Sequence, residues 1–110
     1  MKYVEIQKTL SKNKFQEEEK NADSEKLCLL LYKISCINDW KWVQNTYIRY
    51  LSQQDKWVKI AAIRGFSEIA RCTHNLEKNK VLSQLKNIVK DDTSLEEIVQ
   101  ETIDDIELFL

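Results

Sequence analysis

The stretch that decides the fold is residues 55–72, which read DKWVKIAAIRGFSEIARC. Its apolar residues recur every three or four positions, which is the period of an α-helix with a buried face. Asp55 stands at the start, where an N-cap side chain would accept hydrogen bonds from free backbone amides. Further apolar residues widen this face and leave the charges on a narrow strip. We therefore expect this helix to be the centre of the fold.

Gly65 lies in the middle of this helix and is the only glycine of the chain. A glycine in a helix interior costs about 0.5–1 kcal/mol relative to alanine, so its presence needs a reason. We expect a neighbouring helix to approach Gly65 so closely that a Cβ atom would obstruct the contact.

The composition of the whole chain is that of a small helical protein. The chain has 110 residues, of which 43% are hydrophobic and 32% charged, and it contains no proline. Turns between strands draw on glycine and proline, whereas links between helices can be made of Asn, Asp and Ser. The sequence therefore predicts one all-α domain over residues 1–110.

Apolar periodicity predicts about six helices joined by short links. Asp39 is a second expected N-cap, and Ser94 with Glu97 fits a capping box before the last helix. Residues 12–21 are highly charged and form either a polar helix or a link. Short links favour antiparallel hairpins stacked as an α-solenoid fragment. The helices are expected at about residues 2–11, 24–37, 40–50, 56–72, 76–88 and 95–110.

The cysteines and the apolar runs indicate an intracellular protein. Cys28, Cys36 and Cys72 are odd in number, form no CxxC pair and have apolar neighbours on predicted helices. This pattern favours buried free thiols in a reducing cytoplasm over a disulfide or a metal site. The N-terminus lacks the apolar segment of a signal peptide, and the longest apolar run, residues 27–32, is too short to span a bilayer. We expect a cytoplasmic location.

Charge is distributed unevenly behind a net charge of −1. Residues 39–90 hold ten basic and four acidic side chains, whereas residues 91–110 hold eight acidic side chains and no basic one. Such opposed blocks indicate an interaction surface. Asp104 or Asp105 could instead pair with Arg71 if their helices are neighbours. The other acids, Glu107 among them, would still form an exposed acidic ridge.

Three segments resemble the HEAT-repeat pattern of paired helices. They are Asp39-Trp40-Lys41-Trp42-Val43-Gln44, the segment from Asp55 to Arg71 with its small residues and Gly65-Phe66 step, and Asp104-Asp105-Ile106-Glu107-Leu108-Phe109-Leu110. The chain resembles in particular short bacterial HEAT-like proteins with DWxWVQ and DDIxxFL segments. This resemblance covers residues 39–110 and leaves residues 1–38 as divergent N-terminal helices. Two departures are Lys59 in place of the usual Arg and the lack of a proline before Asp55.

No residue pattern indicates catalysis. His74 is the only histidine and has no second ligand at metal-binding spacing, so a zinc or general-base role is not expected. One glycine cannot make a phosphate-binding loop. The run Glu17-Glu18-Glu19 points in three directions on a helix and cannot act as a catalytic pair. We predict no enzyme activity, no metal and no cofactor, with His74 as a loop residue near a helix end.

The resemblance implies a role in inhibition. Small HEAT-like proteins include immunity proteins of contact-dependent growth inhibition and related toxin systems, which bind a toxin domain and block its active site. A toxin that cleaves RNA or DNA presents a basic surface, which an acidic ridge would complement in a 1:1 heterodimer. The two tryptophans of the expected interface could equally pack between adjacent hairpins. The expected contact residues are Asp91, Asp92, Glu96, Glu97, Glu101, Asp104, Trp42 and Trp57.

Two other functions are open from the sequence. The basic segment 39–90 could bind nucleic acid, although the sequence pI of about 5.9 is low for such a protein. The chain could also be a HEAT-like adaptor or scaffold with an unrelated protein partner. Neither alternative involves a membrane.

Overall fold

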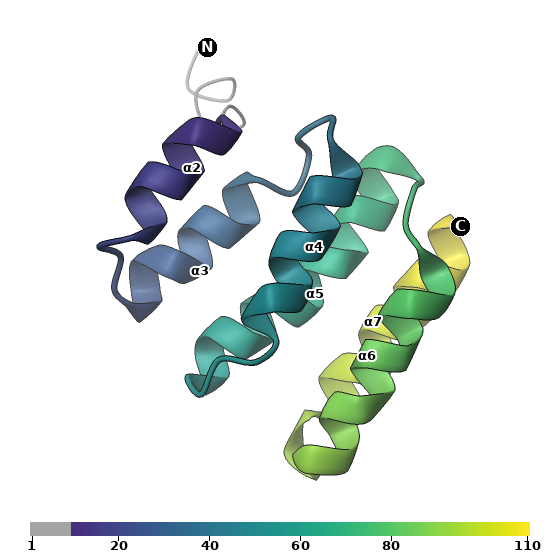
Figure 1. The fold of residues 1–110 in the computed structure, drawn as a ribbon. Helices are drawn as coiled ribbons and strands as arrows, with labels where there is room; N and C mark the ends of the chain where they lie inside the picture. Colours follow the sequence, from purple (N-terminus) through teal and green to yellow (C-terminus); the bar gives the residue numbers. More distant parts are fainter. Residues whose placement is uncertain (1–9) are drawn as a thin grey trace, which may run out of the picture.

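The computed structural model describes residues 10–110, which form six α-helices and one short 3₁₀ helix (Figure 1). The all-α prediction is therefore confirmed for these residues. The predicted helix at residues 2–11 lies outside them, apart from residues 10 and 11. The elements are α2 (Lys12–Glu19), α3 (Ser24–Lys33), α4 (Trp40–Tyr50), α5 (Lys56–Thr73), α6 (Lys78–Asp91), η1 (Thr93–Leu95) and α7 (Glu96–Phe109).

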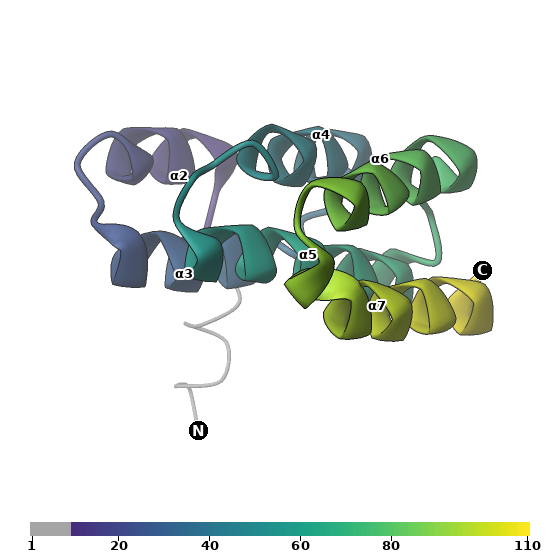
Figure 2. The ribbon, with the colours of Figure 1, turned by 90° about the horizontal axis from the view of Figure 1, so that it is seen from below.

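The helices form three antiparallel hairpins that are stacked in two layers. Figure 2 shows α2, α4 and α6 in one layer and α3, α5 and α7 in the other. Each hairpin therefore contributes one helix to each layer, which is the arrangement of an α-solenoid fragment. The second and third hairpins pair helices that the sequence predicts, whereas the first pairs α3 with residues 12–19, which the sequence left open as a helix or a link.

The helices α3, α5 and α7 run parallel to one another, as contacts at both of their ends show. At the starts, the Ser24 hydroxyl donates to Asp55, and Lys56 Nζ donates to Ser94 Oγ at 2.6 Å. At the far ends, His74 Nδ1 lies 3.1 Å from the Phe109 carbonyl oxygen. The prediction that His74 lies near a helix end is confirmed. Its φ of 56° places it in the left-handed region, where it ends α5.

Contacts at the ends also align α2 with α4. Near the starts, Lys12 Nζ lies 2.7 Å from Asp39 Oδ2. At the other end, Arg49 pairs with Glu19, and the Tyr50 hydroxyl donates to the same carboxylate at 2.5 Å. Burial and this carboxylate raise the pKa of Tyr50 to about 12, so its hydroxyl remains a donor at neutral pH.

Gln44 joins α4 to the third hairpin from a fully buried position. Its Nε2 donates to Glu77 Oε1 at 2.6 Å, and its Oε1 accepts from the Glu77 backbone amide at 2.7 Å. Glu77 is the N-cap of α6, where backbone amides lack partners within the helix. This glutamine is the last residue of the Asp39–Gln44 segment. Its two hydrogen bonds to Glu77 hold the start of α6 against α4.

One hydrophobic core includes side chains from all six helices, and α5 packs against α3, α4 and α7. The prediction of α5 as the central helix is confirmed. The predicted close approach at Gly65 is confirmed as well, because a Cβ atom there would lie 2.7 Å from Tyr47 Cδ2 and closer still to the next ring atom. The same tyrosine ring crosses to α3, where its hydroxyl donates to the Leu31 carbonyl oxygen at 2.6 Å.

Residues 12–19 form a helix rather than a link, in spite of their charge. Ser11 caps it by accepting a hydrogen bond from the Lys14 amide. Phe15 is completely buried, and its ring meets that of Trp42 edge to face at a centroid distance of 5.7 Å. Phe15 thus supplies the apolar contact of this polar helix with the second hairpin, in addition to the polar contacts of Lys12 and Glu19.

The prediction of three free thiols is wrong, because Cys36 and Cys72 form a disulfide. The two residues are 36 positions apart in sequence. Cys36 follows the end of α3 and Cys72 lies near the end of α5, and these two helices are neighbours. Their Cα atoms are 5.6 Å apart, a separation that a disulfide can bridge. Cys28 is the remaining cysteine and is free.

The predicted capping box at Ser94 is wrong as well. Asp92 is the N-cap instead, accepting from the Ser94 amide at 3.0 Å, and it starts the 3₁₀ helix η1. Ser94 therefore lies inside a helical turn, and α7 begins one residue after η1 ends with no side-chain cap. Leu95, the last residue of η1, is completely buried and anchors this turn in the core.

Candidate protein-binding surface

One face of α7 carries the acidic stripe that the sequence predicts. Leu95, Val99, Thr102 and Ile106 recur at helical spacing and are buried against α5 and α6. The opposite face must then point to solvent. Three exposed acids follow one another along it at positions i, i+4 and i+7, namely Glu97, Glu101 and Asp104. We call these three residues the acidic stripe.

Within residues 10–110, no residue of the acidic stripe has an ion-pair partner within 4.0 Å. Asp104 only accepts a hydrogen bond from Gln100 Nε2 at 3.0 Å. The considered pairing of Arg71 with Asp104 or Asp105 is not formed, because Arg71 pairs with Glu68 on its own helix. Glu107 is exposed as expected, but its charge is neutralised by Lys78, whose Nζ lies 2.6 Å from Glu107 Oε1.

The acids before α7 differ from one another in their surroundings. Asp92 is occupied as a cap, because the Ser94 hydroxyl donates to it at 2.6 Å in addition to the amide. These hydrogen bonds, with lesser contributions from Lys56 and Lys59, hold the pKa of Asp92 below its usual value. Asp91 and Glu96 are exposed and lie on either side of this turn. Asp92 thus serves the fold, whereas Asp91 and Glu96 extend the acidic surface.

The two tryptophans of the predicted interface lie in different layers. The Trp42 indole is half-buried between α4 and α2, with Phe15 against its edge and Lys12 Nζ 5.7 Å from its centroid. Trp42 therefore packs between hairpins, which was the alternative to its expected place in the interface. Trp57, at the start of α5, is 72% exposed and belongs to the same layer as the acidic stripe.

Sequence reasoning missed two further exposed apolar residues on α3. Tyr32 is 64% exposed and Leu29 is 52% exposed, although both lie in an apolar sequence. The available signal was that α3 is apolar on most of its circumference, while a helix in one layer of a two-layer fold cannot bury every side. Tyr32 lies across a shallow hollow from Ala61 and Arg64 of α5.

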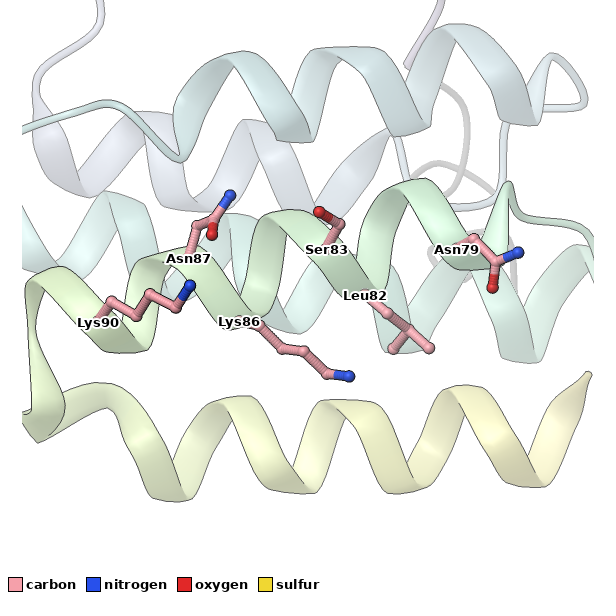
Figure 3. A pocket seen from close by; sticks show the side chains of 6 residues that line it. All are labelled: Asn79, Leu82, Ser83, Lys86, Asn87 and Lys90. Atoms are coloured by element: carbon pink, nitrogen blue, oxygen red, sulfur yellow. The ribbon is translucent and has the colours of Figure 1, made fainter.

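A second kind of surface lies on α6. A hollow there is lined by six side chains of this one helix, and Figure 3 shows Lys86 and Leu82 pointing toward α7 while Ser83 and Asn87 point to the other side. It is a polar depression on a helix surface and contains no carboxylate. The lining residues are Asn79, Leu82, Ser83, Lys86, Asn87 and Lys90.

The part of the chain that the structure describes contains no cluster of metal ligands and no membrane-spanning helix. No group of three or more His, Cys, Asp or Glu side chains in residues 10–110 could hold a metal ion. Among the helices from α2 to α7, none combines the length and the apolar character that crossing a membrane requires.

These observations define an all-α protein of stacked helical hairpins, with an acidic stripe and exposed aromatic side chains on one layer. No protein-family model, curated protein or solved structure matches the chain. The HEAT-like relationship stays a prediction from the Asp39–Gln44, Asp55–Arg71 and Asp104–Leu110 segments.

Proposed function

We propose that the chain is a non-catalytic inhibitor that binds a protein toxin, in the manner of the immunity proteins that its sequence resembles. The partner is a toxin domain with a basic substrate-binding surface, such as a nuclease, and the complex is a 1:1 heterodimer. The observation that carries the proposal is the acidic stripe, whose three carboxylates are exposed and lack ion-pair partners in residues 10–110.

An unpaired stripe of negative charge lowers the stability of α7, which suggests that it has a role outside the helix. Like charges at i and i+4 destabilise a helix by a few tenths of a kcal/mol, and Asp104 lies toward the negative end of the α7 dipole. A basic partner would remove both penalties. Complementary charge also speeds association and excludes wrong partners, both of which an inhibitor of a toxin needs.

Nucleic-acid binding by residues 39–90 has weaker support. Five of the ten basic side chains in this segment form ion pairs with carboxylates: Lys41, Arg49, Arg71, Lys78 and Lys80. The five that remain are divided between two helices, with Lys56, Lys59 and Arg64 on α5 and Lys86 and Lys90 at the polar hollow of α6. Single-stranded or duplex nucleic acid would need a longer basic track to bind well.

The test is capture of the partner in the native host. A tagged chain should co-purify with a protein that carries a toxin domain, at 1:1 stoichiometry, and should abolish the activity of that domain in vitro. Capture of nucleic acid with no protein, or a salt-sensitive gel shift with random duplex, would overturn the proposal in favour of the α6 surface.

Two charge-reversal variants distinguish the effect of the acidic stripe on binding from the effect of net charge. Glu101→Lys should weaken the captured complex at least tenfold, whereas Glu17→Lys makes the same change of charge on an exposed residue of α2 and should leave affinity nearly unchanged. Equal effects of the two variants would show that net charge alone, and not this face of α7, governs binding.

A further inference from the structure

A groove runs between the parallel helices α3 and α5 on the outer side of their layer. Two hollows follow one another along it and share Cys28. The first lies beside Trp57, and the second continues past Tyr32 to Glu68. From Trp57 to Glu68 the groove follows about three turns of α5, or about 16 Å at 1.5 Å per residue.

The groove has a small-residue floor and aromatic walls. Cys28, Ala61 and Gly65 line its middle, and burial raises the pKa of the Cys28 thiol, which is therefore neutral at pH 7. Tyr32 and Trp57 flank this floor and are among the most exposed large apolar side chains of residues 10–110, at 64% and 72%. Exposed aromatic residues beside a hollow are the usual anchors of protein interfaces.

A second, polar groove lies on the other side of α5, toward α7. It is lined by Arg64, Ser67 and Glu68 of α5 and by Glu101, Thr102 and Asp105 of α7. Arg64 and Glu68 line both grooves and so form the ridge between them. Glu68 is paired with Arg71, whereas Arg64, Glu101 and Asp105 have no ion-pair partner within 4.0 Å among residues 10–110. A segment lying in the α3–α5 groove therefore has Arg64 and the paired Glu68 on the ridge beside it, with the acids Glu101 and Asp105 beyond that ridge toward α7.

We infer that the α3–α5 groove is the docking site for an amphipathic helical segment of the partner protein, with apolar side chains between Tyr32 and Trp57 and basic side chains toward α7. This inference rests on the proposed function in taking the partner to be a basic protein. The mode is that of a helix laid in a groove between two helices, with anchors at i, i+3, i+4 and i+7. The charge of the α7 flank selects a basic segment over a neutral or acidic one.

The test uses a defined probe. A 14-residue peptide with Leu at i, i+3, i+4, i+7 and i+11 and Lys elsewhere is titrated into the ¹⁵N-labelled chain, and its twin with Glu in place of Lys is the control. The Lys peptide should shift the amide signals of Cys28, Tyr32, Trp57 and Ala61. The Glu twin should bind at least tenfold more weakly at low salt.

Variants of exposed residues then assign the anchors. Trp57→Ala and Tyr32→Ala should each weaken the Lys peptide roughly tenfold, since both rings are exposed and their loss leaves the core intact. Leu110→Ala removes a different exposed apolar side chain, outside the groove, and should change nothing. Circular dichroism of each variant confirms that it is folded.

Three outcomes would overturn the inference. Signal shifts confined to α7 would mean that charge alone attracts the probe, and equal binding of the Glu twin would remove the basic requirement. Self-association of the chain that Trp57→Ala abolishes would identify a second copy as the occupant.

Failure of the inference is distinguishable from failure of the proposed function. If a toxin is captured and Trp57→Ala leaves its affinity unchanged, the groove is not the docking site although the inhibitor proposal stands. If no toxin is captured but the Lys peptide occupies the groove as described, the inhibitor proposal falls and the groove remains a site for basic helical segments.

Discussion

At the scale of single residues, two buried contacts determine how the helices pack against one another. Gly65 admits the ring of Tyr47, and Tyr47 in turn reaches the Leu31 carbonyl, so one small residue lets three helices meet. Gln44 is a buried amide whose oxygen and nitrogen both bond to Glu77. Sequence reasoning found the first from the cost of a glycine in a helix, but it passed over the second. A glutamine in a polar segment gives no sign that it will be buried.

Replacing Gly65 by alanine should destabilise the protein by about 1–3 kcal/mol, although alanine is the better helix former. The added methyl group would overlap the Tyr47 ring, which is fully buried and held at its hydroxyl by the Leu31 carbonyl oxygen. Urea unfolding measures the loss. In a chain that carries Tyr47→Leu, Gly65→Ala should lower the free energy of unfolding much less than it does in the wild-type chain. Additive losses of unfolding free energy from the two changes would contradict a direct clash.

Replacing Gln44 by alanine should cost about 1–3 kcal/mol, because the Glu77 amide and carboxylate lose buried partners at the start of α6. Gln53→Ala is the matched control, since this glutamine is exposed between α4 and α5. Hydrogen exchange should show the added opening in α6 and α7. Uniform loss of protection over all helices would indicate that Gln44 supports the core in general and does not fix the third hairpin.

At the scale of elements, the helix starts were read well from sequence where an aspartate precedes the helix. Asp39 caps α4 through the Trp42 amide, and Asp55 caps α5 through the Trp57 and Val58 amides. Each cap also bonds to a neighbouring helix, Asp39 to Lys12 and Asp55 to Ser24. These second partners belong to the stacking of hairpins, and no local pattern could predict them.

Acid should weaken the protein through these caps. The Ser24 hydroxyl and backbone amides hold the pKa of Asp55 below its usual value of 3.8, and Lys12 does the same for Asp39. A carboxyl whose pKa is lower in the folded state stabilises the fold above its unfolded pKa, and this stability is lost as pH falls through the folded pKa. The urea midpoint should therefore drop below about pH 4. Asp55→Asn should reduce that drop, whereas Asp91→Asn, outside any cap, should not.

The disulfide links two parallel elements, and its effect should be visible in thiol reactivity. Protein purified without reductant should have one titratable thiol after unfolding, that of Cys28, and three after reduction. Reduction should lower stability by about 3–4 kcal/mol, the entropy cost expected for a loop of this length. Three reactive thiols in the unreduced protein would contradict the bond between Cys36 and Cys72.

At the scale of the whole molecule, the two layers have different tasks. The layer of α2, α4 and α6 holds most of the ion pairs between hairpins, whereas the layer of α3, α5 and α7 carries the exposed aromatic residues and the acidic stripe. An interface on the second layer leaves the contacts of the first intact. Exposed side chains of the second layer, such as Trp57 and Glu101, can therefore be replaced without loss of the ion pairs of the first.

Charge should govern the rate of association more than the lifetime of the complex. The triple variant Glu97→Gln, Glu101→Gln, Asp104→Asn should lower the association rate constant for the captured toxin roughly tenfold at low salt, with a smaller change in dissociation. The difference from the wild-type chain should shrink as ionic strength rises, since salt screens exposed charges. Surface plasmon resonance measures both constants. An unchanged association rate would remove the stripe from the binding mechanism.

By itself the sequence determined the helical class, the capping aspartates, the central position of α5 and the acidic stripe, because each follows from periodicity or composition within one segment. The tertiary structure decided the pairing of Cys36 with Cys72, the bond of Gln44 to Glu77 and the groove between α3 and α5. The physical reason is that these features join residues of different hairpins. Their distances depend on how the hairpins stack, and periodicity fixes which face of a helix is buried but not which neighbour covers it.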